Sequence, residues 1–283
     1  MKEFSPMKFW KMNGAGNDFI IINNIEEHLP ADVFPTLART LCHRHLSIGA
    51  DGLMVVEKAS GNADFKMLFF NSDGSMGEMC GNGARCICRY GYETGLSGKT
   101  QTIETTAGIV TGERMDVRLY RIRLNDPSIA DLHRYTEVNG ATYDCAYVEL
   151  GNPGIPHAVL PWPAIDDRAL FDLGSALRYH KAFPKGANVN FYRITGPDQL
   201  EIKTFERGVE DFTYACGTGT GSTVTVLTLL DKVSGTNVRA RMAGGELTVS
   251  LSHCNNQVTD IYLTGPTNIV AKGEVTDEDL HLI

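Results

Sequence analysis

The sequence predicts an α+β protein with two pseudo-symmetric domains, each a mostly antiparallel sheet wrapped around a central helix. Two segments carry this prediction, MCGNGARC at Met79–Cys86 and ACGTGTGS at Ala215–Ser222. Each places a cysteine on a glycine-rich turn that opens a helix. Each also follows a β-rich run, Phe65–Phe70 in the first case and Leu200–Phe205 in the second. Elsewhere the periodicity is strand-like more often than helical.

Local signals place the individual elements. The first helix begins with Pro30 and carries an apolar stripe. A later helix opens with acidic residues, which suit its positive end, and the other two follow the cysteine turns. The expected helices are Pro30–Cys42, Asn82–Thr94, Asp166–Arg178 and Thr218–Val233. The expected strands are Phe19–Asn23, Leu53–Glu57, Phe65–Phe70, Gln101–Thr105, Gly108–Thr111, Val117–Leu124, Ala146–Leu150, Ala158–Leu160, Val189–Ile194, Leu200–Phe205, Val238–Met242, Glu246–Leu251 and Asp260–Leu263.

The similarity between the two cysteine segments extends to a repeat of landmarks. A Gly-Ala element at Gly49 precedes Cys80 by 31 residues, and another at Gly186 precedes Cys216 by 30. A third glycine-rich landmark stands 33 and 32 residues further back. Two repeats are too few for a solenoid, which needs about three or more. They favour two similar domains related by a pseudo-twofold axis.

The repeat also sets the expected domain limits. The first domain comprises residues 1–126 and carries Cys80, and the second comprises residues 127–265 and carries Cys216. The last stretch, residues 266–283, could return to complete the first domain. We expect the active site in the cleft between the two domains.

Composition limits the classes of partner. Of 283 residues, 42% are hydrophobic and 21% charged, as in an ordinary globular protein, and the net charge is −8. This charge argues against nucleic acid or an anionic membrane as the main partner. No apolar run approaches the ~20 residues that span a bilayer, and the N-terminal residues lack the apolar region of a signal peptide. We therefore expect a cytoplasmic protein that acts on a small molecule.

The cysteines indicate neither a disulfide framework nor a metal site. There are seven, an odd number, and no CxxC occurs. No motif for a PLP lysine or another cofactor is present, so we expect no metal and no cofactor. Cys86 and Cys88 lie inside the helix after Cys80, where we expect them to be core residues.

The two cysteine turns suit proton transfer. Unpaired N–H groups and the dipole at a helix start favour a thiolate, and the neighbouring glycines let N–H groups approach a carboxylate. If Cys80 and Cys216 faced one α-carbon, one thiolate would remove its proton. The other thiol would donate a proton from the opposite face, while the N–H groups stabilised the enolate. The pattern thus predicts racemisation or epimerisation without a cofactor.

At these residues the chain resembles the diaminopimelate epimerases. The matching segments are KMNGAGNDFIIIN, IGADGL, FNSDGSMGEMCGNGARC, GNP with a following PHAV, GANVNF and FERGVEDFTYACGTG. The related proline racemases share a motif like CGTG but normally have histidine where this chain has Asn82. The resemblance implies a PLP-independent, metal-free epimerase of two α/β domains. It would interconvert LL- and meso-2,6-diaminopimelate for lysine and peptidoglycan synthesis, and a homodimer is possible because family members are often dimers.

The resemblance also implies the site residues. Cys80 and Cys216 would be the acid–base pair, with His157 and Glu206 as further catalytic candidates. Glu206 and Arg207 would hold the ammonium and the carboxylate of the distal amino-acid end. The residues that would bind substrate are Asn17, Gly81, Asn82, Gly217 and Thr218 at the reacting end, and Asn71, Asn152, Asn188, Glu206 and Arg207 at the distal end.

Departures from the family pattern keep a second substrate class open. GNPH reads GNPGIPH here, so Gly154–Pro156 separate Asn152 from His157, and Phe212 replaces an acidic residue. The insertion favours a cofactor-independent racemase of another amino acid, such as histidine, glutamate or a proline-like substrate, whereas the retained Glu206-Arg207 pair favours diaminopimelate. A non-catalytic phosphate- or nucleotide-binding module is the alternative from a different class. No Walker or dinucleotide motif supports it.

Overall fold

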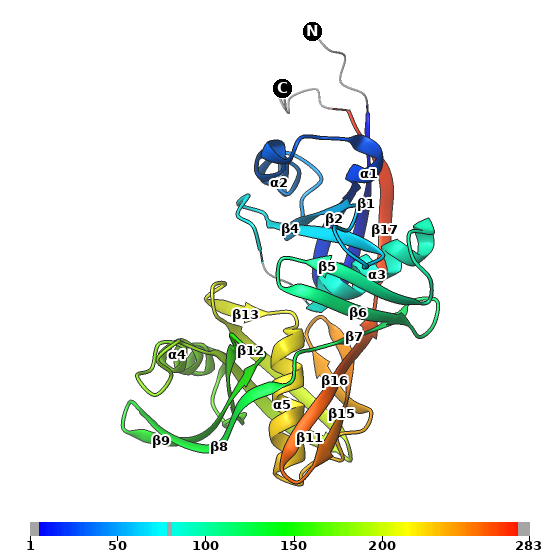
Figure 1. Ribbon diagram of the computed structural model, residues 1–283. Helices are drawn as coiled ribbons and strands as arrows, with labels where there is room; N and C mark the ends of the chain where they lie inside the picture. The colour runs from blue at the N-terminus through cyan, green and yellow to red at the C-terminus, as the bar shows by residue number, and fades with distance from the viewer. Residues whose placement is uncertain (1–5, 78–80, 277–283) are drawn as a thin grey trace. The chain divides into compact units, whose positions relative to one another are not determined.

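The computed structural model describes residues 6–77 and 81–276, which form two compact units (Figure 1). Unit 1 combines residues 1–122 with residues 265–283, and unit 2 comprises residues 123–264. Each unit has its own hydrophobic core and its own central helix. No helix in the described part of the chain is long and apolar enough to cross a membrane.

The sheet of unit 1 has the strand order β17-β1-β2-β3-β4-β5-β6-β7. Neighbours pair antiparallel except at two places, β2 with β3 and β4 with β5, where they run parallel. A helix spans each parallel connection, as such crossovers require. The strands are β1 (Met7–Gly14), β2 (Asn17–Asn23), β3 (Gly52–Glu57), β4 (Phe65–Asn71), β5 (Thr100–Thr105), β6 (Gly108–Arg114), β7 (Leu119–Arg123) and β17 (Asn268–Val275). The helices are α1 (Asn24–Glu27), α2 (Phe34–Leu41) and α3 (Gly81–Thr94).

The sheet of unit 2 has the order β8-β9-β10-β11-β12-β14-β15-β16, and the short β13 pairs with the end of β12. Its parallel pairs are β10 with β11 and β12 with β14. The strands are β8 (Pro127–Val138), β9 (Ala141–Leu150), β10 (Ile155–Pro161), β11 (Asn188–Gly196), β12 (Gln199–Glu206), β13 (Asp211–Thr213), β14 (Val238–Met242), β15 (Gly245–Cys254) and β16 (Gln257–Pro266). The helices are α4 (Asp167–Arg178) and α5 (Gly217–Leu229).

The two sheets therefore repeat one topology. Read from β17 and from β8, the pairings follow the same order: two antiparallel, one parallel, one antiparallel, one parallel and two antiparallel. The helices α2 and α4 occupy the first parallel crossover, and α3 and α5 occupy the second. This internal repeat confirms the predicted α+β class with two pseudo-symmetric halves.

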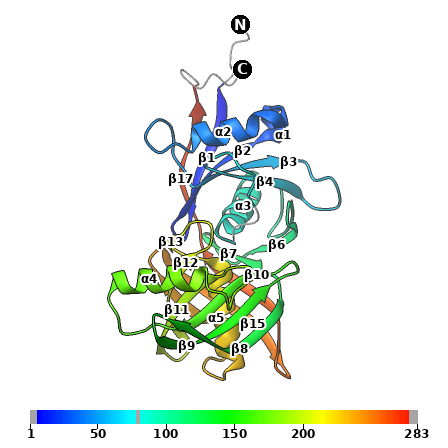
Figure 2. The same cartoon turned by 90° about the vertical axis from the view of Figure 1, so that its left-hand side faces the viewer.

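Each sheet lies between two helices because side chains alternate across a strand. In unit 1, α2 packs on Ile20, Ile22, Leu53 and Val55, while α3 contacts β1, β2 and β6. Figure 2 shows α2 and α3 on opposite sides of β3 and β4. In unit 2, α4 packs on side chains of β10, β11 and β12, while α5 contacts β9, β10, β11 and β15.

The helices α3 and α5 are buried at the centres of their units. Buried residues make up 11 of the 14 in α3 and 11 of the 13 in α5, so each helix is covered on nearly every side. Glycines allow the sheet of unit 1 to close around α3. A Cβ on Gly14 of β1 would lie 2.9 Å from Cys86 Sγ, and a Cβ on Gly112 of β6 would lie 2.2 Å from Cys88 Sγ. Both cysteines are core residues, as expected.

The structure differs from the sequence expectation mainly in exposed strands. The sequence pattern does not predict β1, β8, β13 or β17. Most residues of β8 and β17 are exposed or half-buried, so neither shows the apolar alternation that marks a strand with one buried face. The helix expected at Pro30–Cys42 is shorter. A 3₁₀ turn at Ala31–Val33 comes first, and α2 begins at Phe34 with a proline in its first turn.

Candidate active site

The start of α5 holds Cys216 against backbone N–H groups. Cys216 is the N-cap residue, and its Sγ accepts a hydrogen bond from the Gly219 N–H at 3.4 Å. The Thr220 hydroxyl and N–H both donate to the Cys216 carbonyl, at 2.7 and 2.9 Å. Gly217 and Thr218 form the first turn, where the N–H groups of a helix have no partner within the helix. The sulfur therefore lies at the positive end of a buried helix, a position that favours thiolate and binds anions.

Two residues of the expected distal set meet in unit 2. The side-chain carbonyl of Asn188 accepts the Arg207 N–H at 2.9 Å, and its amide donates to the Pro156 carbonyl at 3.2 Å. The Arg207 guanidinium donates to the Lys185 carbonyl at 3.0 Å. Asn188 thus ties the inserted GNPGIPH segment to the start of the loop that carries Arg207.

Glu206 and Asn152, also expected at the distal end, do not share the hydrogen bonds of Asn188 and Arg207. Burial raises the pKa of Glu206, and the Thr213 hydroxyl donates to its carboxylate at 2.8 Å. No basic side chain within residues 6–77 and 81–276 forms an ion pair with it. Asn152 lies on the exposed turn between β9 and β10, and no hydrogen bond in the described part of the chain joins it to the other distal residues.

His157 is buried on β10 beside β11. Parallel pairing sets it opposite Asn188. Burial, with a smaller effect of the Arg207 charge, lowers the pKa of His157 to about 3, so the ring is neutral near pH 7. Asn190, two residues after Asn188 and on the same face of β11, lies 3.2 Å from the ring with its side-chain nitrogen. The sequence analysis misses Asn190, although the spacing of the two asparagines in GANVNF indicates a shared face.

The start of α3 is the corresponding place in unit 1. Cys80 lies outside the described residues, and Gly81 and Asn82 are the first residues of the helix. The buried Asn82 amide donates to the side-chain carbonyl of Asn17 at 2.6 Å. Arg85, one turn further on, donates to the side-chain carbonyl of Asn82 at 2.8 Å. The structure therefore brings together Asn17 and Asn82, two residues expected to bind the reacting end of a substrate.

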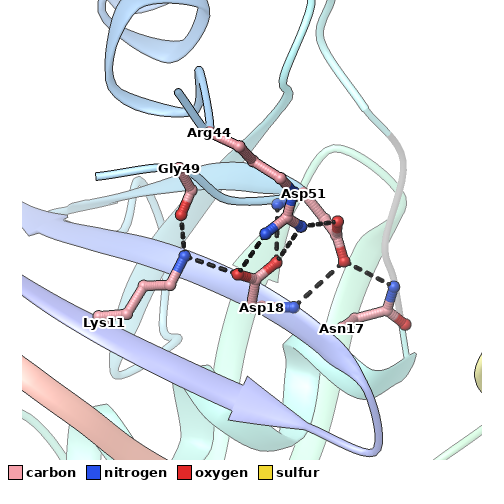
Figure 3. Close-up of polar contacts among 6 residues, drawn as sticks. All are labelled: Lys11, Asn17, Asp18, Arg44, Gly49 and Asp51. Atoms are coloured by element: carbon pink, nitrogen blue, oxygen red, sulfur yellow. Dashed lines mark hydrogen bonds and ion pairs between the residues drawn. The ribbon is translucent and has the colours of Figure 1, made fainter. Parts of the chain in front are cut away.

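A charged network stands behind Asn17 (Figure 3). The Asn17 amide donates to Asp51 at 3.0 Å, and Arg44 bridges Asp51 and Asp18 at 2.6 and 2.7 Å. Lys11 completes the network with an ion pair to Asp18 at 2.7 Å. Burial alone would raise the pKa of Asp18, but the hydrogen bonds from Arg44 and Lys11 outweigh it, and the pKa is lowered. These bonds fix Asn17 with its nitrogen toward Asp51 and its oxygen toward Asn82.

Asn71 is not bonded to this network. It ends β4, where its N–H donates to the Ser75 carbonyl at 2.9 Å and its side-chain amide donates to the Ser75 hydroxyl at 3.0 Å. These bonds close a turn. Asn71 is thus held locally, seven residues before the segment that lies outside the described part.

Three buried thiols are poor nucleophiles. Burial raises the pKa of Cys42 and of Cys88 to about 12, and that of Cys145 to about 11. Cys216 differs because its Sγ accepts a hydrogen bond from the Gly219 N–H at the start of α5. Among the residues with described positions, no cluster of three His, Cys, Asp or Glu side chains is arranged to hold a metal ion.

Comparison with known proteins identifies relatives along nearly the whole chain. The family profile described as diaminopimelate epimerase matches residues 9–121 and 150–270. A diaminopimelate epimerase of Aquifex aeolicus is 36% identical over 97% of this chain and 99% of its own length. Another, of Chlorobaculum tepidum, is 38% identical over 94% of this chain and 100% of its own.

Solved structures share the fold at low identity. A hydroxyproline epimerase from Agrobacterium vitis, with bound trans-4-hydroxy-L-proline, has a TM-score of 0.69 and 18% identity, over 100% of this chain and 96% of its own. A methylitaconate-delta-isomerase has a TM-score of 0.71 and 11% identity, over 97% and 96% of the two chains. At these identities the likeness concerns the fold alone.

Proposed function

The chain belongs to the diaminopimelate epimerase family, and from this premise we propose that it interconverts LL- and meso-2,6-diaminopimelate by moving the α-proton between two thiols. The observation that carries the proposal is the start of α5, where Cys216 Sγ lies against the Gly219 N–H on a buried helix. Family membership and the racemase- and epimerase-like fold agree with an isomerase. The two-thiol mechanism is our inference from the chemistry of this position.

The proposed reaction needs one group on each face of the α-carbon. One cysteine, as thiolate, removes the α-proton, and the electron pair passes into the carboxylate as an enolate. N–H groups at a helix start stabilise that charge. The other cysteine, as thiol, returns a proton to the opposite face, so that one thiol is consumed and one is formed. We assign these roles to Cys216 and Cys80, with Gly81, Asn82, Gly217, Thr218 and Asn17 around the reacting carboxylate.

Glu206 favours a substrate with a second amino-acid end. It is a carboxylate that is partly buried, with a raised pKa and with no ion-pair partner among the described side chains. A ligand ammonium would supply the missing charge. Arg207 beside it would hold the second carboxylate. Asn71, Asn152 and Asn188 remain proposed distal contacts. The side-chain bonds of Asn188 to the Pro156 carbonyl and to the backbone N–H of Arg207 support a role in orienting Arg207.

The alternative substrate is a single amino acid such as histidine, glutamate or proline. The GNPGIPH segment is the feature that favours it, because Pro156 takes one hydrogen bond of Asn188. Such a substrate would leave Glu206 without a cation. We therefore prefer diaminopimelate as the substrate. We propose that the protein acts in the cytoplasm, in lysine and peptidoglycan synthesis.

Exchange of the α-proton in D₂O tests the substrate. The reduced protein is incubated separately with LL-diaminopimelate, L-histidine, L-glutamate and L-proline, and exchange is followed by proton NMR. We expect exchange on diaminopimelate alone. Exchange on a single amino acid instead would contradict the assigned substrate and leave the two-thiol mechanism standing, and exchange on none would contradict both.

A Glu206→Gln variant tests the distal end. It keeps the shape of the side chain but removes the charge that an ammonium would meet. We expect kcat/KM for diaminopimelate to fall by roughly 10–100-fold, the loss of one charge-assisted contact. Unchanged kcat/KM would rule out this role of Glu206.

A further inference from the structure

Asn190 is a fully buried amide that the proposed mechanism does not use. Its exposed fraction is 0%, as is that of His157. Its side-chain nitrogen lies 3.1 Å from the Ala158 carbonyl and 3.3 Å from the Asn188 carbonyl. Its side-chain oxygen accepts the Thr204 hydroxyl at 2.9 Å. An amide buried with both ends engaged has one stable orientation.

That orientation follows from the partners alone. Carbonyl oxygens only accept hydrogen bonds, so the group facing Ala158 and Asn188 must be the NH₂. A flipped amide would instead place its oxygen against the two carbonyl oxygens, which is unfavourable because none of the three can donate to another. The Asn190 nitrogen that faces the His157 ring at 3.2 Å is therefore a donor, and it meets Nδ1.

The state of the imidazole follows in turn. Nδ1 of His157 accepts from Asn190, because an Nδ1–H would point a hydrogen at the NH₂ group. A neutral imidazole carries one proton, which then lies on Nε2. Burial and the Arg207 charge keep the ring neutral by lowering its pKa. Within the described part of the chain, the buried Nε2 has no hydrogen-bond partner.

We propose that Asn190 is a positioning residue that fixes His157 as its neutral Nε2–H tautomer, a donor held ready for a carboxylate oxygen of the bound amino acid. A buried N–H without a partner is destabilising by about 1–3 kcal/mol, so a ligand acceptor at this point gains binding energy without having to displace a protein partner. The nearby charge of Arg207 favours an anionic acceptor. His157 then donates a hydrogen bond and does not act as a base. The choice of acceptor rests on the proposed amino-acid substrate, whereas the tautomer does not.

The tautomer is measured without substrate by ¹⁵N NMR of the histidine rings. The chain has 8 histidines, and loss of one ring in His157→Gln assigns the signal. We expect His157 to show a protonated Nε2 and an unprotonated Nδ1. A protonated Nδ1 in the unmodified protein would overturn the proposal, and this result needs no variant to fold.

Two substitutions test the positioning role. In Asn190→Asp a carboxylate replaces the donor and favours Nδ1–H, so we expect the tautomer to reverse and kcat/KM for diaminopimelate to fall at least about tenfold. The matched control is Thr204→Val. It removes the hydrogen bond to the Asn190 side-chain oxygen but leaves the Asn190 nitrogen facing Nδ1 of His157. We expect the tautomer of the control to stay as in the unmodified protein. A tautomer that reverses equally in both variants, or in neither, would contradict the role of Asn190.

Addition of diaminopimelate distinguishes a failure of the proposed role of His157 from a failure of the proposed substrate. We expect the Nε2–H proton signal of His157 to move downfield on binding. If the signal did not move in a protein that turns the substrate over, the proposed hydrogen bond from His157 to the substrate carboxylate would be refuted. An Nε2–H tautomer in a protein inactive on diaminopimelate would leave the positioning role intact and contradict the substrate.

Discussion

The starts of α3 and α5 occupy equivalent points of the repeated topology but are held in different ways. Behind α3, the Asn82 amide donates to Asn17. From Asn17 a chain of side-chain bonds runs to Asp51 and ends on Arg44, whose side chain is 55% exposed (Figure 3). Behind α5, Asn190, Thr204 and His157 are buried, and none carries a formal charge at neutral pH. One start is held by ion pairs that reach solvent, and the other by close packing of neutral polar groups.

The difference shows that the repeated topology fixes where a helix begins but not which interactions hold it. Ion pairs near water are weakened by salt, whereas a packed neutral network is sensitive to volume and to any buried charge. The α3 start should therefore respond to ionic strength, and the α5 start to small steric changes and to pH. The following experiments test this contrast, from the largest expected effect to the smallest.

Removal of either thiol has the largest expected effect. For Cys216→Ala and Cys80→Ala, we expect kcat to fall by about 10²–10⁴-fold, the usual contribution of a general acid or base. Epimerase turnover measured alongside Cys254→Ala, which removes an exposed thiol, provides the control. Full turnover in Cys216→Ala or in Cys80→Ala would exclude the proposed pair of catalytic thiols.

A single methyl group tests the packing at α5. A Cβ on Gly219 would lie 2.2 Å from the Asn190 side-chain oxygen, so Gly219→Ala must displace the amide. We expect a loss of about 1–3 kcal/mol in the free energy of unfolding, measured by urea denaturation. The control is Gly61→Ala, where a Cβ meets nothing within 4 Å. If both variants were equally stable, the packing account of α5 would be wrong.

The buried imidazole predicts a pH effect on stability. The pKa of His157 is lowered from 6.5 to about 3 by burial and, to a smaller extent, by Arg207. The unfolded state therefore binds the proton first. The stability contributed by the neutral ring is fully present above pH 6.5 and is lost as the pH falls toward 3.

At about 1.4 kcal/mol per pH unit, the loss reaches about 2 kcal/mol by about pH 5. Urea denaturation at about pH 7 and about pH 5 should show this loss in the unmodified protein beyond that in His157→Gln, which has no ring to titrate. An identical pH dependence in the two proteins would contradict a buried neutral histidine.

The smallest effect concerns the ion pairs behind α3. Arg44→Met removes the bridge between Asp18 and Asp51. Since Arg44 is more than half exposed, we expect a loss of only about 0.5–1 kcal/mol in the free energy of unfolding, which should shrink in about 1 M NaCl. The loss caused by Thr204→Val behind α5 should not change with salt. If the two variants depended equally on salt, the contrast between ion pairs behind α3 and neutral packing behind α5 would be wrong.

Local patterns in the sequence predict much of the fold and part of the candidate site. The glycine-rich turns locate the starts of α3 and α5 because helix N-termini depend on residues within one turn. The periodicity locates most strands with a buried face. It fails for β8 and β17, whose exposed residues show no alternation. The position of Cys216 at a helix start is therefore readable from the sequence.

The sequence by itself determined the α+β class, the repeat, the family and the place of Cys216 at a helix start, because each depends on neighbouring residues or on the order of motifs. Only the tertiary structure decided which side chains meet. The bond between Asn17 and Asn82 joins residues 65 apart, and that between His157 and Asn190 joins residues 33 apart. Such contacts depend on strand register, and the neutral state of His157 depends on burial by several elements. Neither property is encoded within a local stretch of the chain.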